Sequence, residues 1–131
     1  MDTFPGPTAD TTDLPTDPAA VLPAVLPAVL AAHLAAHEAR DAERELECYA
    51  DDAVVTDDGN TYRGRAEIRA WIGRAASEYT FTSELTAVRQ DDEEHWTAVR
   101  HLEGDFPGGV VDLSYRYTLD ADRIAELLIT P

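Results

Sequence analysis

Apolar and polar residues alternate with a period of two through most of the second half of the chain. The alternation fills residues 80–90, 95–103, 110–119 and 124–130, and turn-forming residues separate these runs. Because such alternation is typical of half-buried strands, the pattern predicts an antiparallel four-strand meander. Residues 53–57 and 61–63, on either side of the turn Asp58-Gly59-Asn60, predict two further short strands.

The first half of the chain carries the three- and four-residue spacing of helices. A first helix should start near Pro23 or Pro27, since proline is tolerated in a first turn, and end near Ala39. Asp41 is the expected N-cap of a second helix. The residues predicted for the buried side of that helix are Leu46, Tyr49 and Ala50. A third helix should start at Gly64, with a buried stripe of Ile68, Trp71, Ile72, Ala75 and Tyr79. Helices gathered on one face of an antiparallel sheet define the α+β class.

The chain of 131 residues has room for one domain. Residues 1–20 are rich in Pro, Thr and Asp and offer little to bury, so we expect a disordered tail followed by a single domain over residues 21–131. The tail has no basic residue, unlike the start of a signal peptide, and Pro23 and Pro27 interrupt the apolar stretch 19–36. We therefore expect a buried helix in a cytoplasmic protein, and no membrane span.

The charge balance narrows the range of partners. Acidic residues outnumber basic ones 26 to 10, which gives a formal net charge of −16. Such a field repels phosphate backbones and anionic lipids, so nucleic-acid and membrane partners are excluded. The single cysteine, Cys48, excludes an internal disulfide and a zinc site built from cysteines.

Two histidines, His33 and His37, are four residues apart, a spacing that can hold a metal ion from one helical face. No glutamate follows the first histidine, and no third ligand is evident. A packing pair is therefore the favoured interpretation, and no metal site is expected.

Asp57 and Asp58 follow an apolar strand and precede Gly59, which fits a turn with solvated carboxylates. Strand alternation gives a second interpretation, because Asp57 shares a face with Val55 and enters the interior if Val55 is buried. A carboxylate in such a place can shuttle protons. The sequence pattern alone leaves both interpretations open.

Arg100 lies on an otherwise apolar strand face. A buried arginine must be paired, so it predicts either a structural ion pair or a fixed donor that stabilises an anion. Several aromatic residues also fall on predicted inner faces, where they form either core or the wall of a pocket. These residues are Trp71, Tyr79, Phe81, Tyr115 and Tyr117.

The segment CYADDAVVTDDGNTYRGRAEIRAWI resembles the nuclear transport factor 2-like superfamily, in particular its SnoaL-like polyketide cyclase and ketosteroid isomerase branches. The ending DLSYRYTLDADRIAELLI is similar to the last two strands of that fold, and the resemblance covers about residues 23–131. It implies a cone, in which a curved, mostly antiparallel sheet wraps around a long first helix and leaves an apolar pocket at its open end. This scaffold hosts many activities, so the fold by itself does not fix the function.

The resemblance to ketosteroid isomerases also assigns roles to residues. Asp57 falls at the position of the general-base aspartate, and His33 falls at the position of the oxyanion-hole tyrosine. Leu113 occupies the position of the second oxyanion donor, a protonated aspartate, so this chain departs from the isomerases there. Arg100 also lacks an acid two residues on, where Leu102 stands, so the epoxide-hydrolase arrangement is incomplete.

The leading hypothesis is a small-molecule enzyme of SnoaL-like type that transfers protons on a hydrophobic carbonyl compound such as a polyketide. Cyclisation, isomerisation and dehydration all fit, and the resemblance implies no metal or organic cofactor. Asp57 would act as the base, and His33 or Arg100 would stabilise the enolate. The expected substrate-binding walls are Tyr49, Trp71, Tyr79, Phe81, Trp96, Leu113 and Tyr115.

The main alternative is a non-catalytic ligand-binding or dimerisation module of the same fold, and a less favoured one is an epoxide hydrolase. A homodimer is expected in either case, since proteins of this fold commonly pair through the outer face of the sheet. The residues predicted for that surface are Thr97, Val99, His101, Ser114 and Arg116.

Overall fold

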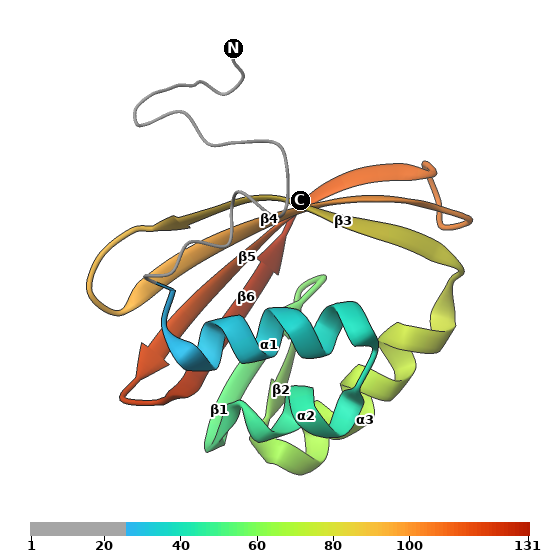
Figure 1. The fold of residues 1–131 in the computed structure, drawn as a ribbon. Coiled ribbons are helices and arrows are strands. Elements are labelled where there is room, and N and C mark those ends of the chain that lie inside the picture. Colours follow the sequence, from blue (N-terminus) through green and yellow to red (C-terminus); the bar gives the residue numbers. More distant parts are fainter. Residues whose placement is uncertain (1–25) are drawn as a thin grey trace.

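The computed structural model describes residues 26–131 (Figure 1). The helices are α1 (Ala28–Ala39), α2 (Ala42–Glu47) and α3 (Gly64–Glu78). The strands are β1 (Tyr49–Asp57), β2 (Asn60–Arg63), β3 (Phe81–Gln90), β4 (His95–Gly104), β5 (Val110–Asp120) and β6 (Arg123–Thr130). The α+β class and every predicted strand region are confirmed. The expected tail, residues 1–20, lies outside the described residues.

Helix α1 begins directly after Pro27, one of the two predicted starts, and ends at Ala39. Arg40 then adopts a left-handed conformation with φ 56°, and its N–H and that of Asp41 bond back to the last turn of the helix. Asp41 caps α2 as predicted, since its carboxylate accepts a hydrogen bond from the Arg44 backbone N–H at 3.2 Å. This tight reversal folds α2 back against α1.

The prediction that Tyr49 and Ala50 lie on the buried side of the second helix is wrong. Helix α2 has only six residues, and Tyr49 is already the first residue of β1. The backbone carbonyl of Cys48 accepts a hydrogen bond from Ile124 N–H at 2.8 Å, and Tyr49 pairs with Ile124. Pairing with the distant strand β6 therefore ends the helix sooner than the local pattern indicated.

The six strands form one sheet in the order β2-β1-β6-β5-β4-β3. All neighbours are antiparallel except β1 and β6, which run parallel. Register shifts in β1, in β3 and between β5 and β6 let the sheet bend. Figure 1 shows the helices on the concave side of this curved sheet, with α1 lying across it.

Directly paired residues point to the same side of a sheet, so the register defines three rows on the inner face. The first row contains Val55, Leu127, Tyr117 and Trp96. The second row contains Asp57, Ile129, Tyr115 and Ala98. The third row contains Leu113, Arg100 and Leu85. Polar groups thus lie in rows that are otherwise apolar.

The predictions that Tyr79 is buried on the third helix and that Thr97 belongs to an open outer surface are both wrong. Tyr79 follows the last residue of α3 in extended conformation, is 38% exposed, and packs edge-on against Phe106 instead of in the core. Thr97 is only 5% exposed, and its hydroxyl donates to the Asp91 carboxylate at 2.5 Å, so it does not belong to an open outer surface. In both cases a neighbouring turn, which periodicity does not report, decides the environment.

Within residues 26–131, no helix is both long enough and apolar enough to cross a bilayer.

Replacing Gly104 by alanine should destabilise the fold, because a Cβ there would lie 2.4 Å from the Thr80 carbonyl oxygen and 2.5 Å from the Phe81 Cβ. We expect the free energy of unfolding to fall by about 1–3 kcal/mol, the usual cost of overpacking. Urea denaturation followed by circular dichroism measures this change.

Gly73→Ala is the matched control. Gly73 is exposed on α3, and a Cβ there meets nothing within 4 Å. Alanine should stabilise that helix by about 0.5–1 kcal/mol. Equal losses at both positions would contradict the tight packing at Gly104.

Candidate functional site

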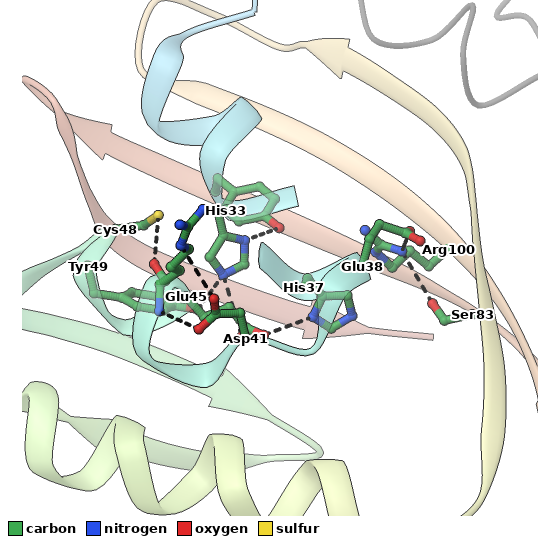
Figure 2. A network of polar contacts seen from close by, with 11 residues as sticks. His33, His37, Glu38, Asp41, Glu45, Cys48, Tyr49, Ser83 and Arg100 are labelled. Atoms are coloured by element: carbon green, nitrogen blue, oxygen red, sulfur yellow. Dashed lines mark hydrogen bonds and ion pairs between the residues drawn. The ribbon is translucent and has the colours of Figure 1, made fainter. Parts of the chain in front are cut away.

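Helix α1 places His33 over the first row of the sheet, between two tyrosine hydroxyl groups. Its Nε2 lies 3.2 Å from the Tyr49 hydroxyl, and its Nδ1 lies 3.1 Å from the Tyr117 hydroxyl. The His33 residue is 2% exposed, and both tyrosine rings meet the imidazole edge-on with centroids 5.4 Å away. Figure 2 shows this ring enclosed beneath the helix.

Burial keeps this triad of Tyr49, His33 and Tyr117 neutral. Desolvation lowers the pKa of His33 from 6.5 to about 4, although the nearby Glu45 carboxylate opposes the shift. Burial also raises the pKa of both tyrosines well above the usual range. A neutral imidazole donates from one ring nitrogen and accepts at the other, so each hydroxyl finds one complementary partner.

This geometry leaves His33 without a free ring nitrogen. The oxyanion-donor role that the resemblance implied needs an N–H facing a substrate, whereas both nitrogens of His33 face tyrosines inside the core. Tyr49 was expected to line the substrate pocket, but it is 0% exposed and therefore belongs to the core. The triad is therefore a buried polar support beneath the site.

Glu45 of α2 lies against both histidines of α1. Its Oε1 is 3.4 Å from His37 Nδ1 and its Oε2 is 3.9 Å from His33 Nε2, and the residue is 7% exposed. The two imidazoles stack with centroids 6.4 Å apart. His33 and His37, which are four residues apart, therefore both face the Glu45 carboxylate. No cluster of three or more His, Cys, Asp or Glu side chains within residues 26–131 is arranged to hold a metal ion.

Arg100 of β4 is 1% exposed and is anchored at one end of its guanidinium group. Its Nη1 donates to Glu38 at 2.7 Å and lies 3.4 Å from Ser83 Oγ. Its Nη2 is buried without a hydrogen-bond partner in the part of the chain that the structure describes. An unpaired buried donor costs about 1–3 kcal/mol, so this N–H group is a buried donor that lacks an acceptor.

Of the two alternatives that the sequence left open for Arg100, the structure shows the ion pair. Glu38 is its ion-pair partner, and no second carboxylate pairs with it among the described residues. The two-carboxylate arrangement of an epoxide hydrolase is therefore incomplete here as well.

Asp57 points to the inner face of the sheet, where Val55 is 0% exposed. The indole Nε1 of Trp71 on α3 donates to Asp57 Oδ2 at 3.0 Å and fixes the carboxylate. Its neighbour Asp58 is exposed and takes the turn position with φ 54°. The two adjacent carboxylates therefore occupy different environments, as strand alternation indicated.

Tyr115 lies in the same inner-face row as Asp57, and Ile129 of β6 separates the two residues. Burial raises the pKa of Tyr115 to about 12, while the charge of Arg100 lowers it and that of Asp57 raises it further. The His37 ring packs edge-on against Tyr115 with centroids 5.9 Å apart. We refer to Asp57, Tyr115, Arg100 and His37 as the Asp57 cluster.

Of the other predicted wall residues, two lie next to the Asp57 cluster and three do not. Trp71 and Leu113 lie next to the cluster, through the hydrogen bond to Asp57 and the pairing with Arg100. Trp96 belongs to the first row, and Phe81 lies beneath the Arg40 guanidinium at 5.6 Å from the ring centroid. Tyr79 lies outside the cluster, in contact with Phe106.

Sequence reasoning missed Glu38 and Glu45, and it considered His37 only as part of a packing pair or as a metal ligand. The partners Arg100 and Glu38 are 62 residues apart, and Tyr117 and His33 are 84 residues apart. No local spacing reports such pairs. The one available signal was the amphipathic position of Glu45 beside the buried Leu46.

An open groove of about 840 Å³ lies elsewhere, along the outward side of α1. It is lined mainly by alanines of that helix, with Asp41 and Arg44 at the start of α2 and Asp122 and Arg123 at the β5–β6 turn. None of its lining residues belongs to the Asp57 cluster.

Comparison with known proteins places this geometry in context. Residues 30–127 match the family model of the SnoaL-like domain. A candidate polyketide cyclase from Sinorhizobium meliloti is 30% identical, with a TM-score of 0.74 over 80% of this chain and 95% of that chain. A search of curated proteins found no match.

Two more distant structures share the fold. A Mycobacterium tuberculosis protein in complex with estradiol-17β-hemisuccinate is 18% identical, with a TM-score of 0.64 over 79% of this chain and 90% of that chain. A computationally designed 17-OHP binder is 16% identical, with a TM-score of 0.63 over the same shares.

The buried His33 predicts a loss of stability in mild acid. The unfolded chain binds a proton at this histidine near pH 6.5, whereas the folded chain binds it only near pH 4. The contribution of neutral His33 to the free energy of unfolding is complete above pH 6.5. It is lost as the pH falls toward 4, by roughly 3 kcal/mol in all. Chemical denaturation at several pH values measures it.

His33→Gln is the control, because glutamine can donate and accept hydrogen bonds without titrating. Its free energy of unfolding should depend less steeply on pH between 6.5 and 4. The same slope in both proteins would contradict the assignment to His33.

Proposed function

The chain belongs to the SnoaL-like domain family, and from this basis we propose that it is a small-molecule enzyme that transfers protons on a hydrophobic carbonyl compound such as a polyketide. The reaction class is cyclisation, isomerisation or dehydration, carried out by side chains without a cofactor. The relationship to the Sinorhizobium meliloti protein supports the polyketide substrate class.

The position of Asp57 carries this proposal. Its carboxylate lies on the inner face beside buried apolar residues, and Trp71 engages only Oδ2. Within the described residues Oδ1 has no hydrogen-bond partner, so it is available to take a proton. A carboxylate that is oriented by one oxygen and open at the other has the arrangement of a general base.

The neighbouring donors complete the chemistry. Asp57 removes a proton from the carbon next to the substrate carbonyl, and negative charge develops on the carbonyl oxygen. The hydroxyl of Tyr115, in the same row as Asp57, and the buried Nη2 of Arg100, in the next row, are the donors proposed for that oxygen. One preorganised donor of this kind contributes about 3–4 kcal/mol to a transition state. Arg100 thus takes the stabilising role, and His33 supports the fold beneath it.

A ligand-binding module without catalysis is the second candidate function. Two proteins of this fold are known with steroids bound or as the design target, at 18% and 16% identity. The buried Tyr49, Tyr117 and Trp96 also fill the inner face around the first row. Binding of an apolar ligand without proton transfer would favour this function over the enzyme.

The base assignment predicts the behaviour of Asp57→Asn. The protein should accelerate exchange of the α-protons of 2-tetralone in D2O, followed by the loss of their ¹H NMR signals. Asparagine still accepts the Trp71 hydrogen bond but cannot take the proton. Exchange should therefore fall about 10²-fold or more, while 2-tetralone affinity, measured by tryptophan fluorescence, changes little.

Asp58→Asn is the matched control and should exchange at nearly the native rate, since asparagine is well tolerated at positive φ. Equal losses in both variants would remove Asp57 as the base. Binding of 2-tetralone without any exchange by the native protein would exclude this enzyme function and leave the binding module.

We further propose a homodimer through the outer face of the sheet. Val99, His101, Ser114 and Arg116 lie there, partly or fully exposed. His101 contacts Glu103 and Asp112 at 2.7 Å each, which reduces carboxylate repulsion on this surface. Light scattering at micromolar concentration should give twice the mass of one chain, and Ser114→Glu should weaken pairing. A single-chain mass for the native protein would contradict the dimer.

A further inference from the structure

We propose that His37 is a second acid–base residue of the Asp57 cluster and that Glu45 is its positioning residue. This inference rests on the proposed function, because it assigns the group that exchanges a proton with the substrate oxygen while Asp57 acts on carbon. The substrate is then an apolar molecule whose oxygen lies against His37 when its acidic carbon lies at Asp57.

The two histidines of α1 differ in accessibility. The His33 side chain is 3% exposed and uses both ring nitrogens, whereas the His37 side chain is 28% exposed. Nδ1 of His37 faces Glu45, and Nε2 has no hydrogen-bond partner within residues 26–131. Figure 2 shows His37 in contact with Glu45, and it shows the contacts of Arg100 with Glu38 and Ser83 as a separate group.

In this proposal Glu45 supplies the negative charge that balances a proton on His37. Glu45 is 7% exposed, and a buried carboxylate needs an opposite charge nearby. His33 remains neutral at ordinary pH because burial lowers its pKa to about 4. His37 is the other histidine in contact with Glu45, at 3.4 Å. A contact of this length in a ligand-free site can shorten when the imidazole becomes charged.

The carboxylate also decides which nitrogen reacts. A carboxylate beside Nδ1 favours the proton on that atom, and Nε2 becomes the atom that gives or accepts a proton. The groups that face His37 are Glu45 from α2, Tyr115 from β5 and His33 from its own helix. Of these, only Glu45 is a carboxylate, so it dominates the choice.

The proton transfers balance between two protein groups. Asp57 takes the proton from the α-carbon, and the C–H electron pair forms the carbon–carbon double bond of the enol. The carbonyl π electrons move to oxygen, which takes the Nε2 proton of the charged His37. Asp57 is then neutral, and His37 is neutral with its remaining proton at Nδ1. Return of both protons regenerates the starting charges.

The test uses 2-naphthol, an apolar enol analogue, with naphthalene as the probe that lacks the oxygen. In ¹⁵N NMR of the native protein, the neutral form of the His37 ring should carry its proton at Nδ1, and 2-naphthol should shift the Nε2 signal. His37→Gln should weaken 2-naphthol binding about threefold to tenfold, the range of one hydrogen bond, and leave naphthalene binding unchanged.

Glu45→Gln tests the positioning role separately. It should move the ring proton away from Nδ1 in the ¹⁵N spectrum and weaken 2-naphthol binding, while Glu45→Asp should preserve the native proton position. His95→Gln, on the β3–β4 turn side of the sheet, is the control and should change neither binding nor the His37 signals.

Two results would overturn the proposal. One is the absence of a His37 signal shift with millimolar 2-naphthol, and the other is equal weakening of both probes by His37→Gln. Neither result depends on the exchange assay with 2-tetralone. Loss of exchange in Asp57→Asn together with an unaffected His37 would therefore refute only the role of His37. A responsive His37 without any exchange would refute the proposed enzyme together with the acid–base role, and would leave His37 as a residue that binds the ligand oxygen.

Discussion

Polar side chains on the inner side of α1 must find partners inside the fold, and this requirement organises the molecule. His33 faces the first row of the sheet, where a polar group is costly unless it is hydrogen-bonded. The hydroxyls of Tyr49 and Tyr117 satisfy both ring nitrogens. These partners come from the first strand and the fifth, so one imidazole ties the helix to two separate parts of the sheet.

The tight turn between α1 and α2 satisfies a second part of the same requirement. Left-handed Arg40 and the cap at Asp41 reverse the chain within two residues, and Glu45 then meets both histidines. Glu38, the residue after His37 on α1, reaches Arg100 at 2.7 Å. Helix α1 is therefore fixed over the sheet by polar contacts at several points, in addition to its buried leucines.

The inner face separates supporting groups from groups that remain open to a ligand. The Tyr49–His33–Tyr117 triad is buried, neutral and fully paired. The Asp57 cluster has unused hydrogen-bonding atoms, namely Asp57 Oδ1, Arg100 Nη2 and His37 Nε2, among the described residues. Fully paired groups give rigidity, and unused atoms held by rigid neighbours give a preorganised site. This division supports the assignment of chemistry to the cluster.

The sequence by itself determined the elements and the direction in which many side chains point. Period two gave the strands, the 3.6-residue period gave the helices, and the shared face of Val55 and Asp57 pointed the carboxylate inward. Only the tertiary structure decided which groups meet. The parallel pairing of β1 with β6 moved Tyr49 into a strand, and it set Asp57 beside Tyr115 across Ile129. The packing of α1 against the sheet gave His33 two tyrosine partners, and its packing against α2 gave His37 a glutamate. Periodicity reports which face a residue occupies, whereas a contact between residues far apart in sequence depends on how whole elements pack against each other.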